Sequence, residues 1–134
     1  MTRRRAAILA GGYPYLVAER DGIVLGHAYA SAYRTRPAYR FAVENSVYVA
    51  PDHQRDGIGR ALLPMLIDRC TAAGFRVMVA VIGDSANHGS IGLHAACGFS
   101  HAGLLPGIGW KHGLWVDSVL MTRMLGAGTA IPPD

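Results

Sequence analysis

The order of apolar and polar positions along the first half of the chain predicts a short helix followed by strands. A helix is expected over 3–10, because Gly11 and Gly12 end it. Asp21-Gly22 is a strong hairpin signal that joins a strand over 15–18 to a returning strand over 23–30. Residues 40–49 alternate and then become rich in Val and Tyr, as a central strand does.

The second half predicts helices between strands. Apolar residues at helical spacing indicate a helix over 58–73 that ends at Gly74, with Pro64 predicting either a kink or a later start. The apolar run 75–82 is typical of a strand buried on both faces. A short helix and two more strands follow, and the tail is expected to be loose. These last segments cover residues 90–96, 102–105, 116–124 and 126–134.

This order predicts one α/β domain over residues 1–134. The strand–helix–strand unit over 41–82 indicates two parallel central strands, and the outer strands are expected to pair antiparallel, so the sheet is mixed. A length of 134 residues is usual for a single domain. The chain is 51% hydrophobic and 16% charged, which excludes a disordered or fibrous protein.

The charge balance favours anionic partners. Lys and Arg number 13 against 9 Asp and Glu, a balance that suits phosphates, carboxylates or nucleic acid. Basic residues are not interleaved with aromatics on one element, so a nucleic-acid interface is not expected. No apolar run approaches the roughly 20 residues of a membrane span, and the first apolar stretch is shorter than the apolar core of a signal peptide. We therefore expect a cytoplasmic protein with no membrane partner.

Cysteines and histidines do not indicate a metal site. Cys70 and Cys97 lie far apart without the spacing of zinc ligands, so two reduced thiols are expected. The histidines lack a pattern such as H-E-x-x-H. No metal is predicted.

The sharpest local feature is a glycine-containing loop between a predicted strand and a predicted helix. Gly57 and Gly59 remove Cβ atoms where backbone N–H groups would approach a ligand, and a helix N-terminus attracts phosphate. Arg55 and Arg60 add positive charge. The loop is neither a Walker loop nor a G-x-G-x-x-G motif. From the residues alone, it is either a phosphate-binding loop or a glycine-rich helix start without a ligand.

Several motifs extend this observation. Residues 54–59 (QRDGIG) resemble the pyrophosphate loop [Q/R]-x-x-G-x-[G/A] of the GNAT superfamily of acetyl-CoA-dependent N-acetyltransferases. Asn87, the run 90–94 (SIGLH) and Gly98-Phe99 resemble a second element of that superfamily. Further stretches are most similar to its phosphinothricin-acetyltransferase-like group, which acetylates amino acids and their analogues. They are residues 37–40, 44–49, 79–83 and 109–113, with Trp115 and Asp117.

The resemblance implies a GNAT-like sheet with a shortened N-terminus, because only residues 1–12 precede Tyr13 where the family usually has a first strand and helix. It also implies acetyl-CoA as cosubstrate, held by backbone groups of the central strand and the loop, with the Val49 N–H as oxyanion donor. The implied cofactor-binding residues are Val47, Tyr48, Val49, Gln54, Arg55, Asp56, Gly57, Ile58, Gly59, Arg60 and Asn87.

Two residues are candidates for proton transfer. Glu44 lies on the predicted central strand, where an acid is costly unless it is paired, hydrated or used. A carboxylate with a raised pKa can take the proton that an amine must lose before it attacks a thioester; the alternative is an ion pair with Arg40 or Arg36. The resemblance implies that His94 donates a proton to the departing thiolate, whereas a lone His on a short helix is more often structural.

The sequence defines the binding site for the acetyl acceptor less closely than the site for acetyl-CoA. Tyr39 and Arg40, with Arg34 and Arg36, are candidates to hold a substrate carboxylate, or they form a solvated basic loop. Residues 111–117 are expected near the substrate or at a contact within a homodimer.

Three functions follow from these observations. We expect direct transfer of acetyl from acetyl-CoA to the primary amine of a small amino acid or analogue, of the phosphinothricin or methionine sulfone type. The alternatives are a non-catalytic acyl-CoA-binding relative with an incomplete acceptor site and, from the pI of 9.4 alone, a nucleic-acid-binding protein.

Overall fold

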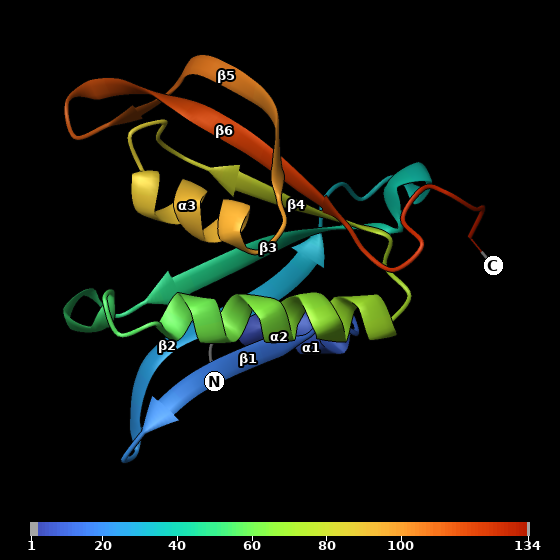
Figure 1. The fold of residues 1–134 in the computed structure, drawn as a ribbon, viewed down its shortest axis with the longest axis horizontal. Helices are drawn as coiled ribbons and strands as arrows, with labels where there is room; N and C mark the ends of the chain where they lie inside the picture. The colour runs from blue at the N-terminus through green and yellow to red at the C-terminus, as the bar shows by residue number, and fades with distance from the viewer. Residues whose placement is uncertain (1–2, 134) are drawn as a thin grey trace.

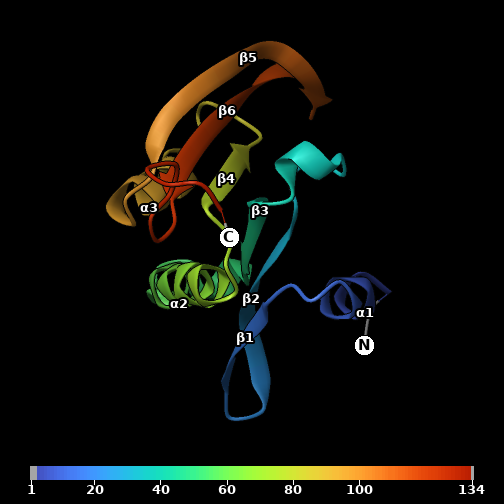
Figure 2. The same ribbon diagram turned by 90° about the vertical axis from the view of Figure 1, so that its right-hand side faces the viewer.

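The computed structural model describes residues 3–133, which form a twisted six-stranded sheet with helices on both faces (Figures 1 and 2). The strands lie in the order β1-β2-β3-β4-β6-β5. In chain order the elements are α1 (Arg3–Ala10), β1 (Tyr15–Arg20), β2 (Ile23–Ala32), the 3-10 turn η1 (Pro37–Tyr39), β3 (Ala42–Val49), the 3-10 turn η2 (Pro51–His53), α2 (Ile58–Ala72), β4 (Val77–Ile82), α3 (His88–Ala96), β5 (Ser100–Lys111) and β6 (Leu114–Met124).

The predicted order of elements and the mixed sheet are confirmed. Strands β3 and β4 are parallel, and every other neighbouring pair is antiparallel. Asp21 and Gly22 both have positive φ, 52° and 80°, which is the backbone of the predicted hairpin turn. Helix α2 begins at Ile58 and runs through Pro64, so the later start is wrong. Strand β5 is much longer than predicted.

Helices α2 and α3 lie on one face of the sheet and α1 lies on the other (Figure 2). Small residues of β2 allow α2 to approach: Ala28 and Ala30 are fully buried, and a Cβ on Gly26 would lie 3.0 Å from Ile58 of α2 and 2.6 Å from the Tyr48 carbonyl oxygen. Leucines of α2, together with residues of the central strands, fill this core.

The two central strands are paired over only three positions. The pairs are Ala42 with Val77, Val43 with Met78, and Glu44 with Val79. Beyond them β3 continues along β2 as far as Val49, whereas β4 continues along β6 as far as Ile82. The sheet therefore opens between its central strands after Glu44.

The C-terminal segment lies against the fold more closely than the sequence predicts. The Arg76 guanidinium donates to the carbonyl oxygens of Gly128, at 3.0 Å, and Ile131, at 2.8 Å. The Leu125 N–H donates to the Arg76 carbonyl oxygen at 2.9 Å, and the Leu125 side chain is fully buried. Residues 126–133 thus lie beside the start of β4. Within residues 3–133, every helix falls short of the length and apolarity needed to cross a membrane.

The surroundings of Gly26 and Gly92 predict opposite effects for Gly→Ala substitutions at these two positions. Gly26→Ala places a Cβ against the Tyr48 backbone, so we expect a loss of roughly 1–3 kcal/mol in the free energy of unfolding. Gly92 is exposed in α3 with nothing within 4 Å of its added Cβ, so Gly92→Ala should stabilise by about 0.5–1 kcal/mol. Urea unfolding measures both, and equal effects would contradict the packing described.

Candidate functional site

A pocket of about 470 Å³ opens on the face of the sheet that carries α2 and α3. Its wall comes from three places: the part of β3 beyond the last pair with β4, the loop that leads into α2, and the first turns of α3. The lining residues are Val47, Val49, Gln54, Arg55, Gly57, Gly59, Arg60, Asn87, Gly89, Ser90 and Leu93. Most of the predicted cofactor residues therefore come together here.

Three of the predicted residues do not line this pocket. The Tyr48 side chain stacks on His27 of β2, with ring centroids 5.2 Å apart. The Asp56 carboxylate pairs with the imidazole of His53 at 2.8 Å. Ile58 is buried in the core under α2. Side chains alternate between the two faces of a strand and repeat about every 3.6 residues along a helix, so residues next to the pocket-lining ones can point away from the pocket.

The sequence analysis missed three lining residues of α3, namely Gly89, Ser90 and Leu93. The signal that would have found them is the spacing from Asn87. This residue caps α3, because its Oδ1 accepts from the Ser90 N–H at 3.2 Å, and Ser90 and Leu93 follow on one helical face. With Oδ1 engaged in the cap, the Asn87 Nδ2 is the part of its side chain left for a ligand.

Backbone groups of β3 point into the opening. The Ala50 N–H donates to Leu25 and the Ala42 carbonyl accepts from Tyr33, so even-numbered residues of β3 direct their backbone to β2. Odd-numbered residues direct theirs to the opposite side. Val47 and Val49 therefore present N–H and C=O groups to the side from which β4 has diverged. Such a strand edge can pair with an extended ligand.

The two loop glycines serve different purposes. Gly57 precedes α2 with φ of 77°, a conformation that side chains rarely adopt, and nothing lies within 4 Å of its added Cβ. At Gly59 a Cβ would meet Leu93 Cδ2 at 3.1 Å. Gly59 therefore lets α2 pack closely against α3, a reason that the sequence analysis did not include. Arg55 and Arg60 supply positive charge beside the N-terminus of α2.

Glu44 lies at the last paired position of β3, on the opposite face from α2. It is half-buried, and Ser31 is its cross-strand neighbour on β2. Burial raises the pKa of the Glu44 carboxyl above 4.5, and the positive charge of Arg34 offsets part of this rise. Arg40, one of the two predicted ion-pair partners, donates instead to the Pro37 carbonyl oxygen at 2.8 Å. The carboxylate therefore sits at the mouth of the opening in an environment that favours proton uptake.

His94 is buried rather than exposed to the pocket, with 3% of its surface accessible. Its Nδ1 lies 2.7 Å from the Ser90 carbonyl oxygen and its Nε2 lies 3.2 Å from Asn45 Oδ1. The ring packs edge-on against Phe99, with centroids 4.9 Å apart. Burial lowers the pKa of His94. Because both ring nitrogens contact protein atoms, this arrangement does not favour proton donation to a group in the pocket.

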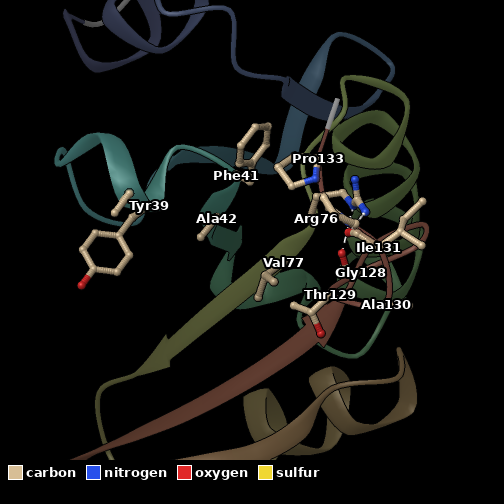
Figure 3. A pocket seen from close by; sticks show the side chains of 12 residues that line it. Tyr39, Phe41, Ala42, Arg76, Val77, Gly128, Thr129, Ala130, Ile131 and Pro133 are labelled. Carbon is tan, nitrogen blue, oxygen red and sulfur yellow. Dashed lines mark hydrogen bonds between the residues drawn. The ribbon is translucent and has the colours of Figure 1, made fainter.

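Tyr39 and Arg40 lie at the other end of β3 from the glycine loop. Tyr39 lines a second pocket, of about 480 Å³, that is mainly apolar and lies between η1, the starts of β3 and β4, and the C-terminal segment. Figure 3 shows Tyr39 on one side of this pocket and Arg76, bonded to Gly128 and Ile131, on the other. The structure therefore separates the predicted carboxylate-binding residues from the first pocket.

The remaining candidate chemistry is sparse. Within residues 3–133 no cluster of three His, Cys, Asp or Glu side chains is placed to hold a metal ion. Both cysteines are free thiols, and burial raises the pKa of Cys70 to about 11, which makes it a poor nucleophile.

Comparison with known proteins places this architecture in a family. The family model described as Acetyltransferase (GNAT) family matches residues 2–99. The chain is 54% identical over 134 residues to phosphinothricin N-acetyltransferase of Alcaligenes faecalis, covering 100% of this chain and 68% of that protein. It is 45% identical over 123 residues to the L-methionine sulfoximine/L-methionine sulfone acetyltransferase of Salmonella typhimurium, covering 92% and 70%.

A solved structure agrees with this relationship. The GNAT superfamily phosphinothricin acetyltransferase from Sinorhizobium meliloti, crystallised in complex with acetyl-CoA, superposes with a TM-score of 0.94 at 53% identity. The match covers 98% of this chain and 71% of that one. The chain belongs to the GNAT acetyltransferase family, and the fold and enzyme class predicted from its motifs are confirmed.

The raised pKa of Glu44 predicts how the Glu44→Gln variant behaves on unfolding. Between pH 4.5 and the higher folded pKa, the folded protein binds more protons at this residue than the unfolded chain, so wild-type stability falls as the pH rises. Gln does not titrate. We therefore expect Glu44→Gln to gain stability relative to wild type from pH 4 to pH 7, as measured by urea unfolding. The matched control, Glu19→Gln at exposed Glu19, should show no such gain, and a relative loss for Glu44→Gln would contradict the assignment.

Proposed function

We propose that this protein transfers the acetyl group of acetyl-CoA to the primary amine of a small amino acid or amino-acid analogue, of the phosphinothricin or methionine sulfone type. The observation that carries the proposal is the opening between β3 and β4. It has a phosphate-loop pocket on one face and a half-buried carboxylate, Glu44, at its mouth on the other. The names of the relatives support the substrate class, since they include phosphinothricin and methionine sulfoximine acetyltransferases.

The pocket residues suit the two chemically distinct parts of acetyl-CoA. The pyrophosphate would lie at the N-terminus of α2, where unpaired N–H groups, Arg55 and Arg60 favour negative charge. The pantetheine arm carries amide groups, and the exposed backbone of Val47 and Val49 would pair with them as a strand edge does. Asn87 would donate from Nδ2. This arrangement directs the thioester through the opening toward the face that carries Glu44.

Glu44 then acts as the general base. A substrate amine is mainly ammonium near neutral pH, and Glu44 accepts one proton from it, directly or through water, so that the nitrogen lone pair can attack the thioester carbonyl carbon. The C–N bond forms as the C–S bond breaks. The Val49 N–H, which points into the opening, stabilises the developing negative charge on the carbonyl oxygen, an effect of about 3 kcal/mol for one such donor.

The leaving group does not require a dedicated acid. A thiol has an ordinary pKa of about 8.5, so sulfur can depart as a thiolate near neutral pH. The nitrogen loses a second proton as the amide forms. The coenzyme A thiolate takes up one proton, which gives the free thiol. His94 is therefore not needed as the acid that the family resemblance implies.

The acceptor's carboxylate would meet the basic segment before β3. Arg34 is the charge that acts on Glu44, and Arg36, Tyr39 and Arg40 follow it on exposed backbone. Arg forms paired hydrogen bonds with carboxylates. We assign substrate binding to this segment, with Tyr39 and Arg40 as its predicted members.

We also propose a cytoplasmic homodimer. The free thiols are those of a reducing compartment. The β5–β6 hairpin exposes large apolar side chains, including Trp110 at 63% and Trp115 at 70%, which contact each other with ring centroids 4.9 Å apart. Exposed apolar surface of this kind marks contact sites.

The dimer proposal predicts a change of mass on disrupting the hairpin surface. Light scattering after gel filtration should give twice the chain mass for wild type and the monomer mass for the Trp110→Ser, Trp115→Ser double variant. A monomeric wild-type protein would contradict it.

The activity itself is tested by amine-dependent thiol release from acetyl-CoA, with phosphinothricin, methionine sulfone and methionine sulfoximine as acceptors. We expect turnover in wild type and a loss of roughly 10²- to 10⁴-fold in kcat/KM for Glu44→Gln, the usual contribution of a general base. Glu19→Gln on exposed β1 is the matched control and should retain activity. Binding of acetyl-CoA without turnover of any acceptor would instead favour the non-catalytic acyl-CoA-binding alternative.

A further inference from the structure

Asn45 occupies a distinctive position in the sheet. It is the first residue of β3 beyond the last pair with β4, and its side chain points to the face that carries α3. Only 7% of its surface is accessible. Its Nδ2 is buried and has no hydrogen-bond partner within residues 3–133. A buried N–H donor without a partner is rare, because it loses its hydrogen bonds to water without replacement.

His94 Nε2, which faces the Asn45 carboxamide, can act as the acceptor that Asn45 Nδ2 lacks. His94 Nδ1 lies 2.7 Å from the Ser90 carbonyl oxygen, which can only accept, so Nδ1 carries a proton. In a neutral imidazole Nε2 is then an acceptor. Asn45 Oδ1, which faces Nε2 at 3.2 Å, is an acceptor too. This contact is favourable only if the imidazole is doubly protonated, or if the carboxamide turns its Nδ2 toward Nε2.

Burial decides between these two arrangements. The 3% accessibility of His94 disfavours its charged form and lowers its pKa, so near neutral pH the imidazole is neutral. The two ends of a carboxamide have nearly the same shape, so rotation by 180° costs little packing. Rotation gives Nδ2 an acceptor and removes the contact between two acceptors. After the rotation Oδ1 is the atom without a partner. This costs less, because buried carbonyl oxygens without partners are more common than buried N–H groups without partners.

We propose that Asn45 is a positioning residue that donates from Nδ2 to His94 Nε2, fixes His94 as the neutral Nδ1–H tautomer, and thereby anchors α3 to β3 beside the pocket. The chain of hydrogen bonds runs from the Asn45 carboxamide through the imidazole to the Ser90 carbonyl. It links β3 to α3 on the face of the sheet that carries the pocket.

The anchor matters because it adds a polar contact between α3 and β3 to the apolar packing of Ile91 and Leu93 against the core. Helix α3 is nine residues long, and His94 is its buried residue. The same helix supplies Ser90 and Leu93 to the pocket wall, opposite Val47 and Val49 of β3. The Asn45–His94 contact therefore helps to set the distance between the two walls. This consequence rests on the proposed function, whereas the tautomer of His94 does not.

Both ring nitrogens of His94 are engaged by protein atoms. With Nδ1–H donated to Ser90 and Nε2 accepting from Asn45, no ring N–H is directed at the pocket. His94 is thus a second positioning residue, which acts through the placement of α3.

The tautomer is measured directly by long-range ¹H–¹⁵N correlation spectra of the ¹⁵N-labelled wild-type protein at pH 7.5, with the His94 ring signals identified by their absence in His94→Gln. We expect a protonated-type Nδ1 and an unprotonated-type Nε2. In Asn45→Asp, whose carboxylate can only accept, both nitrogens should become protonated. A protonated Nε2 in wild type, or an unchanged Nε2 in Asn45→Asp, overturns the proposal. This measurement needs no turnover, so it stands whether or not the proposed function does.

The anchoring role is measured with Asn45→Ala, by calorimetric binding of acetyl-CoA and by steady-state kinetics. Loss of one buried hydrogen bond should raise Kd and KM for acetyl-CoA roughly three- to tenfold and leave kcat within about twofold. The control is Thr71→Ala, which removes a half-buried hydrogen bond to the Ile67 carbonyl oxygen (2.8 Å) in the last turn of α2, away from the pocket, and should leave Kd unchanged.

His94→Gln separates positioning from proton donation. Gln keeps an acceptor for Asn45 and has no titrating group, so kcat should stay within about threefold and the pH profile should keep its shape. A fall in kcat of about 100-fold with loss of the basic limb of the profile identifies His94 as an acid and overturns the proposal.

Discussion

The short pairing between β3 and β4 is the constraint on which the rest of this structure depends. Three residue pairs hold the two strands together, and each strand then follows a different neighbour. A backbone edge in the middle of a sheet would normally be satisfied by the adjacent strand. Here Val47 and Val49 direct their N–H and C=O groups at the opening, where our proposal places acetyl-CoA.

The elements around this opening are arranged by packing as much as by chemistry. A Cβ on Gly59 would lie 3.1 Å from Leu93 Cδ2, so the glycine allows α2 and α3 to approach closely. Gly26 permits α2 to rest on β2. Apolar contacts therefore place the N-terminus of α2 beside the end of β3. The unpaired N–H groups of this N-terminus attract phosphate. Glu44 faces the opposite side because side chains alternate along a strand.

Sequence patterns predicted the order of elements and most of the pocket because both depend on local signals. The Asp21-Gly22 turn, the apolar run before Ile82 and the loop from Gln54 to Gly59 are each contained in a few residues. Long-range features could not be predicted in this way. Nothing local to Asn45 or His94 indicates that they meet across 49 positions of the chain. The bonds from Arg76 to the C-terminal segment are of the same kind, and Tyr39 lies by a second pocket that local patterns do not reveal.

The central claim is that acetyl-CoA occupies the opening and pairs with the backbone of β3. Amide hydrogen exchange of the wild-type protein, resolved by residue with and without acetyl-CoA, tests it most directly. The Val47 and Val49 N–H groups, which face the opening, should gain protection when acetyl-CoA is bound, as should the N–H groups of Gly57 and Gly59. The Tyr48 N–H, which is directed to β2, should change little. Unchanged exchange at Val47 and Val49, or protection confined to the pocket beside Tyr39 and Ile131, would contradict the account.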